Sequence, residues 1–236
     1  MEYQSVNMMI QIEYCSGSTL KDHLAKRNEK PGFAFVSLNE GVIDREENLA
    51  IFTDVINGMA EIHKKCIMHR DLKPENIFIG EKEGNLVAKI GDFGLAWMLN
   101  GSQEELRKDE VSVGTNRNSL FSSVAGTLAY MAPEIRSHYS AGTQPPKHPD
   151  MEVNMKQDIY SLGLILYEIC HKIKTGMQRT QLFRSLDNNR KITDACPLSP
   201  DVHIEHELIL RMTERDPASR PSALEIIQNY LPIWRE

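Results

Sequence analysis

The clearest pattern in this sequence is a set of apolar residues three or four positions apart over residues 45–65. The apolar positions are Leu49, Phe52, Val55, Ile56, Met59 and Ile62. Because an α-helix turns once every 3.6 residues, these side chains would share one face, and we expect that face to cover a core. Residues 158–171 are apolar on almost every side instead, which predicts a fully buried helix.

Weaker helical patterns occur elsewhere in the chain. They cover residues 19–26, 179–186, 205–213 and 222–231. Ser222 begins the last of these and has Glu225 three positions later, which is the arrangement of a capping box. Stretches rich in glycine, proline or polar residues predict irregular segments between the helices. These stretches are residues 28–44, 95–125 and 136–152.

Two parts of the sequence have the pattern of β-strands. Residues 6–15 form an apolar run that predicts a single strand. Residues 76–79 and 86–90 are short apolar runs joined by a polar turn, which predicts a β-hairpin. We therefore expect an α+β fold that is mostly helical and contains one small hairpin.

The composition fits one globular domain over residues 1–236. Apolar residues make up 41% of the chain and charged residues 25%, and both values are ordinary. The formal net charge of −6 gives no electrostatic reason to expect a nucleic acid or an anionic membrane as a partner. No apolar run approaches the ~20 residues of a membrane-spanning helix.

The positions of cysteine and histidine favour neither a disulfide framework nor a metal site. The four cysteines are widely spaced and contain no Cys-x-x-Cys pair, so we expect reduced thiols and a cytoplasmic location. His203 and His206 lie three positions apart, but no cysteine or carboxylate arrangement completes a zinc site around them. A structural role is therefore expected for both histidines.

The candidate chemistry lies in the segment His-Arg-Asp-Leu-Lys-Pro-Glu-Asn at residues 69–76. It places the carboxylate of Asp71, the ammonium group of Lys73 and the carboxamide of Asn76 within six residues. A second carboxylate, Asp92, follows in the sequence Asp-Phe-Gly. Phosphoryl transfer needs an acceptor for a hydroxyl proton, a cation on the moving phosphate and oxygen ligands for Mg²⁺. The hairpin between the two motifs is expected to bring their side chains together.

The order of these motifs resembles that of the eukaryotic protein kinase domain. His-Arg-Asp with an asparagine five positions after the aspartate, then Asp-Phe-Gly, then Ala-Pro-Glu at residues 132–134 follow one another as in that family, and Arg220 comes late in the chain. The resemblance covers about residues 8–231. It implies a protein-kinase-like fold with a hinge strand at 6–15, a helical large lobe at 16–236 and an activation segment at 92–134.

The resemblance implies a role for each chemical group. Asp71 would accept or orient the proton of the substrate hydroxyl. Lys73 would neutralise charge on the transferred phosphate, and its presence indicates a serine/threonine substrate. Asn76 and Asp92 would hold Mg²⁺. Thr127 would contact Asp71 and Lys73 near the acceptor residue.

Further residues would bind nucleotide or support the site. ATP would place its adenine against the backbone of Glu13 and Cys15, over an apolar floor that includes Phe78. The resemblance assigns supporting roles to His69, Phe93, Gly94, Glu134, Asp158 and Arg220. His69 and Phe93 would pack in the hydrophobic column of the active state, with Gly94 as the turn. Glu134 would pair with Arg220, and Asp158 would brace the catalytic loop.

Arg70, just before Asp71, implies control by phosphorylation of the activation segment. In kinases with this arginine, a new phosphate pairs with arginine and orders the segment. By position, Ser122 and Ser123 are the expected acceptors.

Several stretches resemble, more narrowly, the kinases that phosphorylate the alpha subunit of translation initiation factor 2. The most discriminating is Thr-Gly-Met-Gln-Arg at residues 175–179, followed by Leu182. In that family this pattern opens a helix that docks a folded substrate. The resemblance therefore implies that Met177, Arg179 and Leu182, on a helix at about 177–187, recognise the alpha subunit of the initiation factor.

The start of the sequence departs from the kinase pattern. Residues 1–12 contain no lysine and no glycine, so neither a Gly-x-Gly-x-x-Gly loop nor a strand lysine is present there. We expect the N-terminal lobe to be largely missing, ATP binding to be weak, the chain by itself to be nearly inactive and dimerisation through that lobe to be doubtful. An unpaired apolar strand at 6–12 would also favour aggregation.

Two other functions remain open from the sequence. A lone large lobe could bind the initiation factor without phosphorylating it, as a kinase fragment or pseudokinase. The chain could also be a kinase with a different serine/threonine substrate. If Arg179→Glu left phosphorylation of the initiation factor intact, the assignment of that substrate would be wrong.

Overall fold

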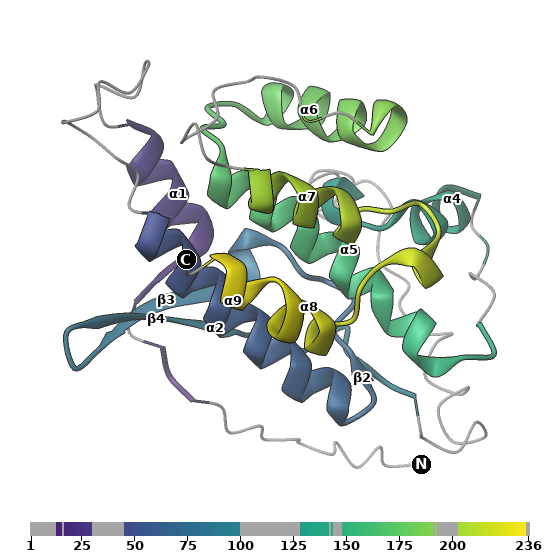
Figure 1. Ribbon diagram of the computed structural model, residues 1–236, viewed down its shortest axis with the longest axis horizontal. Coiled ribbons are helices and arrows are strands. Elements are labelled where there is room, and N and C mark those ends of the chain that lie inside the picture. Colours follow the sequence, from purple (N-terminus) through teal and green to yellow (C-terminus); the bar gives the residue numbers. More distant parts are fainter. Residues whose placement is uncertain are drawn as a thin grey trace, which may run out of the picture.

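The computed structural model describes residues 13–15, 17–29, 45–99, 128–141, 143, 148–190, 192 and 203–234. Two long helices form the centre of this part: α2 (Arg45–Lys64) and α5 (Met151–Cys170). Helix α7 (His203–Met212) packs on α5, and α8 (Ala223–Asn229) packs on α2. The described fold is therefore helix-rich, as the sequence predicts (Figure 1).

Helix α2 follows the predicted spacing closely. Phe52, Ile56 and Met59 are completely buried, and their shared face contacts the core. The opposite side of α2 is polar and carries Glu46 and Glu47 in its first turn, where carboxylates interact favourably with the helix dipole.

Helix α5 begins seven residues before the predicted start. The Asp150 carboxylate accepts a hydrogen bond of 2.8 Å from the Glu152 backbone N–H, which caps the first turn. Helix α4 (Pro133–Ala141) likewise extends into the segment predicted to be irregular. The prediction for residues 136–152 is therefore wrong at both ends. At the α5 end, the Asp150 cap adds helical turns that apolar spacing does not reveal.

Two of the three remaining helices overlap predicted segments and extend beyond them, and the third lies almost wholly after residue 231, where no helix was predicted. They are α1 (Leu20–Glu29), α6 (Gly176–Asn189) and α9 (Leu231–Trp234). The Thr175 hydroxyl caps α6 by accepting a hydrogen bond of 3.1 Å from the Gln178 backbone N–H. The capping box of Ser222 and Glu225 is confirmed, since each side chain accepts a hydrogen bond from the backbone N–H of the other residue.

The predicted hairpin is confirmed and is longer than expected. Strands β3 (Ile77–Lys82) and β4 (Asn85–Ile90) pair antiparallel, with Ile77 opposite Ile90. The turn residues Glu83 and Gly84 both have positive φ, as a tight two-residue hairpin turn requires. In Figure 1 the hairpin lies beside α2, and β4 packs on that helix.

Two short pairings were not predicted, because their strands have only two residues each. Strand β1 (Ser18–Thr19) adds to β3, and β2 (Ile67–Met68) pairs with β5 (Trp97–Met98). Gly17 permits the first pairing, since a Cβ atom there would lie 1.6 Å from the Ile79 carbonyl oxygen.

A strand was predicted over residues 6–15, but residues 13–15 have no regular structure, so the prediction is wrong for these three residues. Residues 6–12 lie outside the described part of the chain. Residues 100–127, most of the predicted activation segment, lie outside it as well.

Helix α1 is tied to the end of α5 by one arginine. The guanidinium group of Arg27 donates hydrogen bonds of 2.7–3.2 Å to the carbonyl oxygens of Ile169, Glu168 and His171. Burial lowers the pKa of Arg27 to about 10. The Glu168 and Ile169 acceptors belong to the last turn of α5, where helix carbonyls have no partner within the helix, and His171 is the C-cap residue.

In the described residues, no helix is both long and apolar enough to cross a membrane. Cys15, Cys66 and Cys170 form no disulfide within the described residues, and Cys196 lies outside the described part.

Candidate functional site

The catalytic-type residues gather around the carboxylate of Asp71, which is buried. Asp71 Oδ2 accepts a hydrogen bond of 2.6 Å from Lys73 Nζ and one of 3.1 Å from Asn76 Nδ2. Asn76 Nδ2 also donates to the Asp71 backbone carbonyl at 2.8 Å. A short 3₁₀ turn, Pro74–Asn76, bends the chain so that these side chains meet. The three groups predicted to perform phosphoryl transfer therefore lie in direct contact.

The second oxygen of Asp71 is buried and has no hydrogen-bond partner among the described residues. Leaving a buried acceptor unpaired costs about 1–3 kcal/mol. A donor that reached this oxygen, such as a hydroxyl group, would remove that cost. Thr127, which the sequence places near Asp71, lies outside the described part.

Asp158 of α5 holds the loop that carries Asp71. Its Oδ2 accepts a hydrogen bond of 2.8 Å from the His69 backbone N–H, and its Oδ1 accepts one of 2.9 Å from that of Arg70. The side chain of His63 also lies 3.1 Å from Oδ2. Arg70 has φ of 70°, a strained conformation for a residue other than glycine. The buried carboxylate thus supports the loop at its strained residue.

The Asp-Phe-Gly segment is joined to the same loop. His69 Nε2 lies 3.0 Å from the Gly91 carbonyl oxygen, and the rings of His69 and Phe93 are 5.1 Å apart. The Gly91 backbone N–H donates to the Asn76 carbonyl at 2.9 Å, which joins the residue before Asp92 to Asn76 at the end of the hairpin. Asp92 and Phe93 are exposed.

These two segments could provide oxygen ligands for Mg²⁺ through Asn76 and Asp92. Mg²⁺ is usually bound by one or two protein carboxylates together with phosphate oxygens and water. One carboxamide oxygen and one carboxylate are compatible with this mode of Mg²⁺ binding. Within the described residues, no group of three or more histidine, cysteine, aspartate or glutamate side chains is arranged to hold a metal.

The residues predicted to face adenine lie beside the hairpin. The Glu13 carboxylate forms an ion pair with Lys89 of β4, and this hydrogen bond lowers the pKa of Glu13 and raises that of Lys89. The ring of Phe78 lies against Gly91, where an added Cβ would be 2.5 Å from the ring. Cys15 is partly buried.

Glu134 and Arg220 form a two-pronged ion pair in which the arginine is buried and the glutamate is partly exposed. The Arg220 guanidinium donates to both carboxylate oxygens, at 2.7 and 2.8 Å, and only 1% of the arginine is exposed. The guanidinium also lies 5.0 Å from the centre of the Tyr160 ring. The pair ties the start of α4 to the segment before α8. Such paired geometry is the strongest form of arginine–carboxylate contact.

The three residues predicted to dock a substrate have different surroundings on α6. Met177 is 74% exposed. Leu182 is only 7% exposed and packs in the core. The Arg179 side chain turns inward, with Nε 2.9 Å from Glu168 Oε1. Direct contact with a substrate fits Met177 and does not fit Leu182, because burial withdraws that side chain from the surface.

Two residues of this region were missed from the sequence: Glu168 and Tyr130. The Tyr130 hydroxyl donates a hydrogen bond to the Glu168 carboxylate, which burial keeps away from water. A glutamate inside the apolar run of α5 was the available signal, since such a charge needs a partner.

Of the residues predicted to regulate activity, the structure describes Arg70 but not the two serines. Ser122 and Ser123 lie outside the described part. The Arg70 side chain is exposed, and its guanidinium lies 5.6 Å from the centre of the Trp97 ring. Gly94 donates its backbone N–H to Asp92 Oδ1 at 3.3 Å.

The chain is similar in sequence to several known protein kinases. The chain is 31% identical over 95% of its length to the "Probable serine/threonine-protein kinase ifkB" of Dictyostelium discoideum. It is 30% identical over 95% of its length to "eIF-2-alpha kinase GCN2" of Schizosaccharomyces pombe, and 30% identical over 94% to "Eukaryotic translation initiation factor 2-alpha kinase PK4" of Plasmodium berghei. It spans 16%, 12% and 8% of these relatives' own lengths.

The resemblance to the initiation-factor kinases is thereby confirmed. A family model described as "Protein kinase domain" matches residues 1–231, which is nearly the whole chain. This chain belongs to the protein kinase domain family.

Proposed function

We propose that this chain is the catalytic part of a serine/threonine kinase that transfers the γ-phosphate of ATP to the alpha subunit of translation initiation factor 2. The observation that carries the catalytic half of the proposal is the environment of Asp71. One carboxylate oxygen is held by Lys73 and Asn76, and the other is buried with no partner among the described residues.

Each side chain has a chemical task in this proposal. Asp71 orients the substrate hydroxyl and accepts its proton at the free oxygen as the bond from the hydroxyl oxygen to the γ-phosphorus forms, while the bond from that phosphorus to the bridging oxygen breaks and ADP leaves. Lys73, 2.6 Å from Asp71, neutralises negative charge on the phosphate in transfer. Asn76 and Asp92 would hold Mg²⁺, which screens the phosphate charges when bound. The Asp158 carboxylate keeps the loop in its strained shape.

The substrate assignment is supported by the names of similar proteins and by the shape of α6. Two of the relatives described above are named as kinases of initiation factor 2 alpha. The outer side of α6 is exposed and offers a surface for a folded protein. Its exposed residues are Met177, Thr180, Gln181, Arg184 and Asn188.

A phosphorylation assay tests the proposal. The chain is incubated with the purified alpha subunit and Mg²⁺-ATP, with Asp71→Asn as a control that keeps the size of the side chain and removes its charge. We expect slow serine phosphorylation, in keeping with weak ATP binding, and a rate that falls further by about 10²–10⁴-fold, or below detection, in the control. Phosphorylation of other proteins but not of this subunit would show that the substrate assignment is wrong.

Nucleotide binding is measured separately by calorimetry, beside Asp92→Ala. We expect weak binding of Mg²⁺-ATP that the substitution abolishes. Tight binding of the alpha subunit, with no ATP binding and no phosphorylation, would instead support a substrate-binding module without catalysis.

A further inference from the structure

Helix α6 lies at one end of the described fold, set apart from the neighbouring helices (Figure 1). Side chains three and four positions apart connect it to the rest of the lobe. The inward residues are Arg179, Leu182, Phe183, Leu186 and Asp187. Arg179 lies on the same side of the helix as the buried leucines, and opposite the exposed residues proposed above to meet the substrate.

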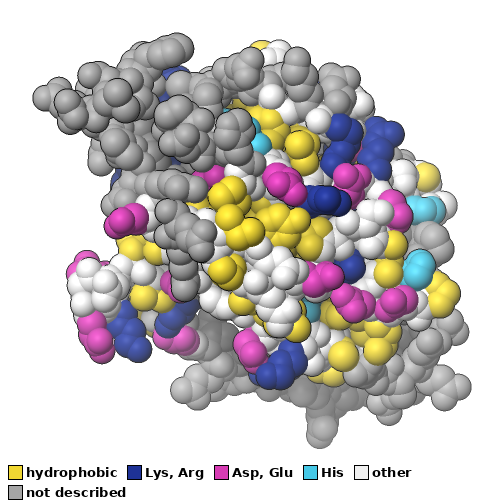
Figure 2. All heavy atoms as spheres, viewed as in Figure 1, with side chains coloured by type: hydrophobic (Ala, Val, Ile, Leu, Met, Phe, Trp, Pro, Cys, Tyr) yellow, Lys and Arg dark blue, Asp and Glu magenta, His cyan; other side chains and the backbone are white. Residues whose placement is uncertain are grey.

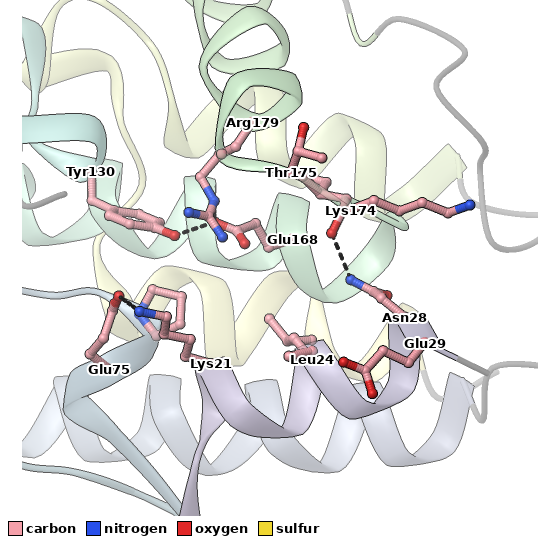
Figure 3. A pocket seen from close by; sticks show the side chains of 14 residues that line it. Lys21, Leu24, Asn28, Glu29, Glu75, Tyr130, Glu168, Lys174, Thr175 and Arg179 are labelled. Carbon is pink, nitrogen blue, oxygen red and sulfur yellow. Dashed lines mark hydrogen bonds and ion pairs between the residues drawn. The ribbon is translucent and has the colours of Figure 1, made fainter. Parts of the chain in front are cut away.

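The Arg179 side chain reaches a buried acid. Its Nε is 2.9 Å from Glu168 Oε1, and the Glu168 side chain is 5% exposed. The Tyr130 hydroxyl donates to the same oxygen, so the carboxylate joins Arg179 to Tyr130 (Figure 3). Burial raises the pKa of Glu168, and the neighbouring charge of Arg179 opposes that rise. Without Arg179, the carboxylate would lose its nearest positive charge.

A second contact connects the same turn of α6 to Tyr130. The ring of Phe183, four positions after Arg179, lies edge-on to the Tyr130 ring at 5.6 Å. The Tyr130 carbonyl accepts a hydrogen bond of 2.8 Å from the Ser161 hydroxyl of α5. Tyr130 is thus held by α5 and α6 together, three residues before α4 begins.

These residues face the catalytic loop across one cavity. The cavity has a volume of about 440 Å³, and its wall includes Glu75, Tyr130, Glu168 and Arg179. Glu75 lies directly before Asn76, in the turn that positions the contacts of Asp71. Figure 3 shows Glu75 paired with Lys21 on one side and the Arg179 group on the other. The contacts that orient α6 therefore lie close to the loop that carries Asp71.

We propose that Arg179 is a positioning residue: it acts through Glu168 and Tyr130 to fix the outer face of α6 relative to Asp71, and it does not touch the substrate. The inference rests on the proposed function, because it takes the exposed side of α6 to be the docking surface. It replaces the direct contact that sequence resemblance implies for Arg179 with an internal one.

A double-mutant cycle on the 236-residue chain tests this. Affinity for the initiation factor's alpha subunit is measured for Arg179→Ala, Glu168→Gln and both together. If Arg179 acts through Glu168, each single change weakens binding about tenfold and the pair weakens it by the same factor. If Arg179 contacts the substrate itself, the two effects multiply to about a hundredfold, and the inference is wrong.

Matched variants make the result specific. Arg184→Ala removes an exposed arginine from the outer face of the same helix, and its effect should multiply with that of Glu168→Gln. Arg179→Lys keeps the positive charge beside Glu168 and should restore affinity to within about threefold of the wild type. Failure of the lysine variant to restore affinity, with the fold intact, would contradict an ion-pair role.

Hydrogen exchange gives a readout that does not depend on the substrate. Arg179→Ala and Glu168→Gln should each speed exchange of the α6 amides to the same extent, and Arg184→Ala should leave them unchanged. If the wild-type chain does not bind the alpha subunit, the substrate assignment fails and exchange alone decides the role of Arg179. Unchanged exchange in both variants would overturn the inference.

Discussion

Replacing Asp158 with asparagine should weaken the hydrogen bonds that hold the catalytic loop, which contains Asp71, against α5. The carboxylate accepts hydrogen bonds from the backbone N–H groups of His69 and Arg70 and lies 3.1 Å from the His63 ring. Asparagine has one oxygen acceptor, so its NH₂ group would face one of these donors. The backbone N–H of His69 or Arg70 that faces the NH₂ group would then be buried without an acceptor, because Asp158 is only 1% exposed.

The magnitude follows from these contacts. A hydrogen bond to a charged group contributes about 1.5–3 kcal/mol, and an unsatisfied buried donor costs about 1–3 kcal/mol. Because the two terms overlap, we expect a loss of about 3 kcal/mol in the free energy of unfolding. For a domain of this size that corresponds to a fall of roughly 6–12 °C in Tm.

Asp150→Asn is the matched control, because it makes the same substitution on the same helix. Asp150 is an exposed N-cap, and asparagine caps helices about as well as aspartate, so a change of only a few tenths of a kcal/mol is expected. Urea unfolding followed by circular dichroism compares the two variants. If they differ by less than about 0.5 kcal/mol, the hydrogen bonds of Asp158 do not carry the stability assigned to them here.

Two further predictions concern buried charged or titratable groups. Arg220→Leu should lower the free energy of unfolding by about 3–5 kcal/mol, because it removes a buried guanidinium that donates hydrogen bonds to Glu134 and to three backbone carbonyl oxygens; urea unfolding would show this, and a loss below 1 kcal/mol would contradict it. Burial lowers the pKa of His171 to about 4, and the unfolded chain binds this proton near pH 6.5. Stability should therefore fall by up to about 1.4 kcal/mol per pH unit as pH drops from 6.5 to 4, and the slope should be smaller in His171→Asn.

The sequence predicts local elements well when apolar spacing determines them. Helix α2 and the β3–β4 hairpin both follow from periodicity and turn residues. The first turns of α5 do not, because the Asp150 cap that starts them is a single hydrogen bond. The two-residue strands are also invisible in the sequence, since each depends on a partner far along the chain.

The candidate site divides in the same way. Asp71, Lys73 and Asn76 are close in sequence, and a short turn is enough to bring them into contact. The inward direction of Arg179 depends on Glu168, which comes from another helix. The spacing of Arg179 with Leu182 and Phe183 does place it on the inner side of α6. That information was present in the sequence, although a charged residue is not normally assigned to such a face.

The contact of Arg27 with the end of α5 bears on the order in which the protein folds. The arginine and its acceptors are separated by 141–144 positions in the sequence. Helix α5 can begin to form from local contacts, but its last carbonyl groups remain bonded to water until this long loop closes. The turn that presents Glu168 should therefore become native late. In a nascent chain in which α5 has already formed, the part of the cavity wall that contains Glu168 would not yet have its native conformation.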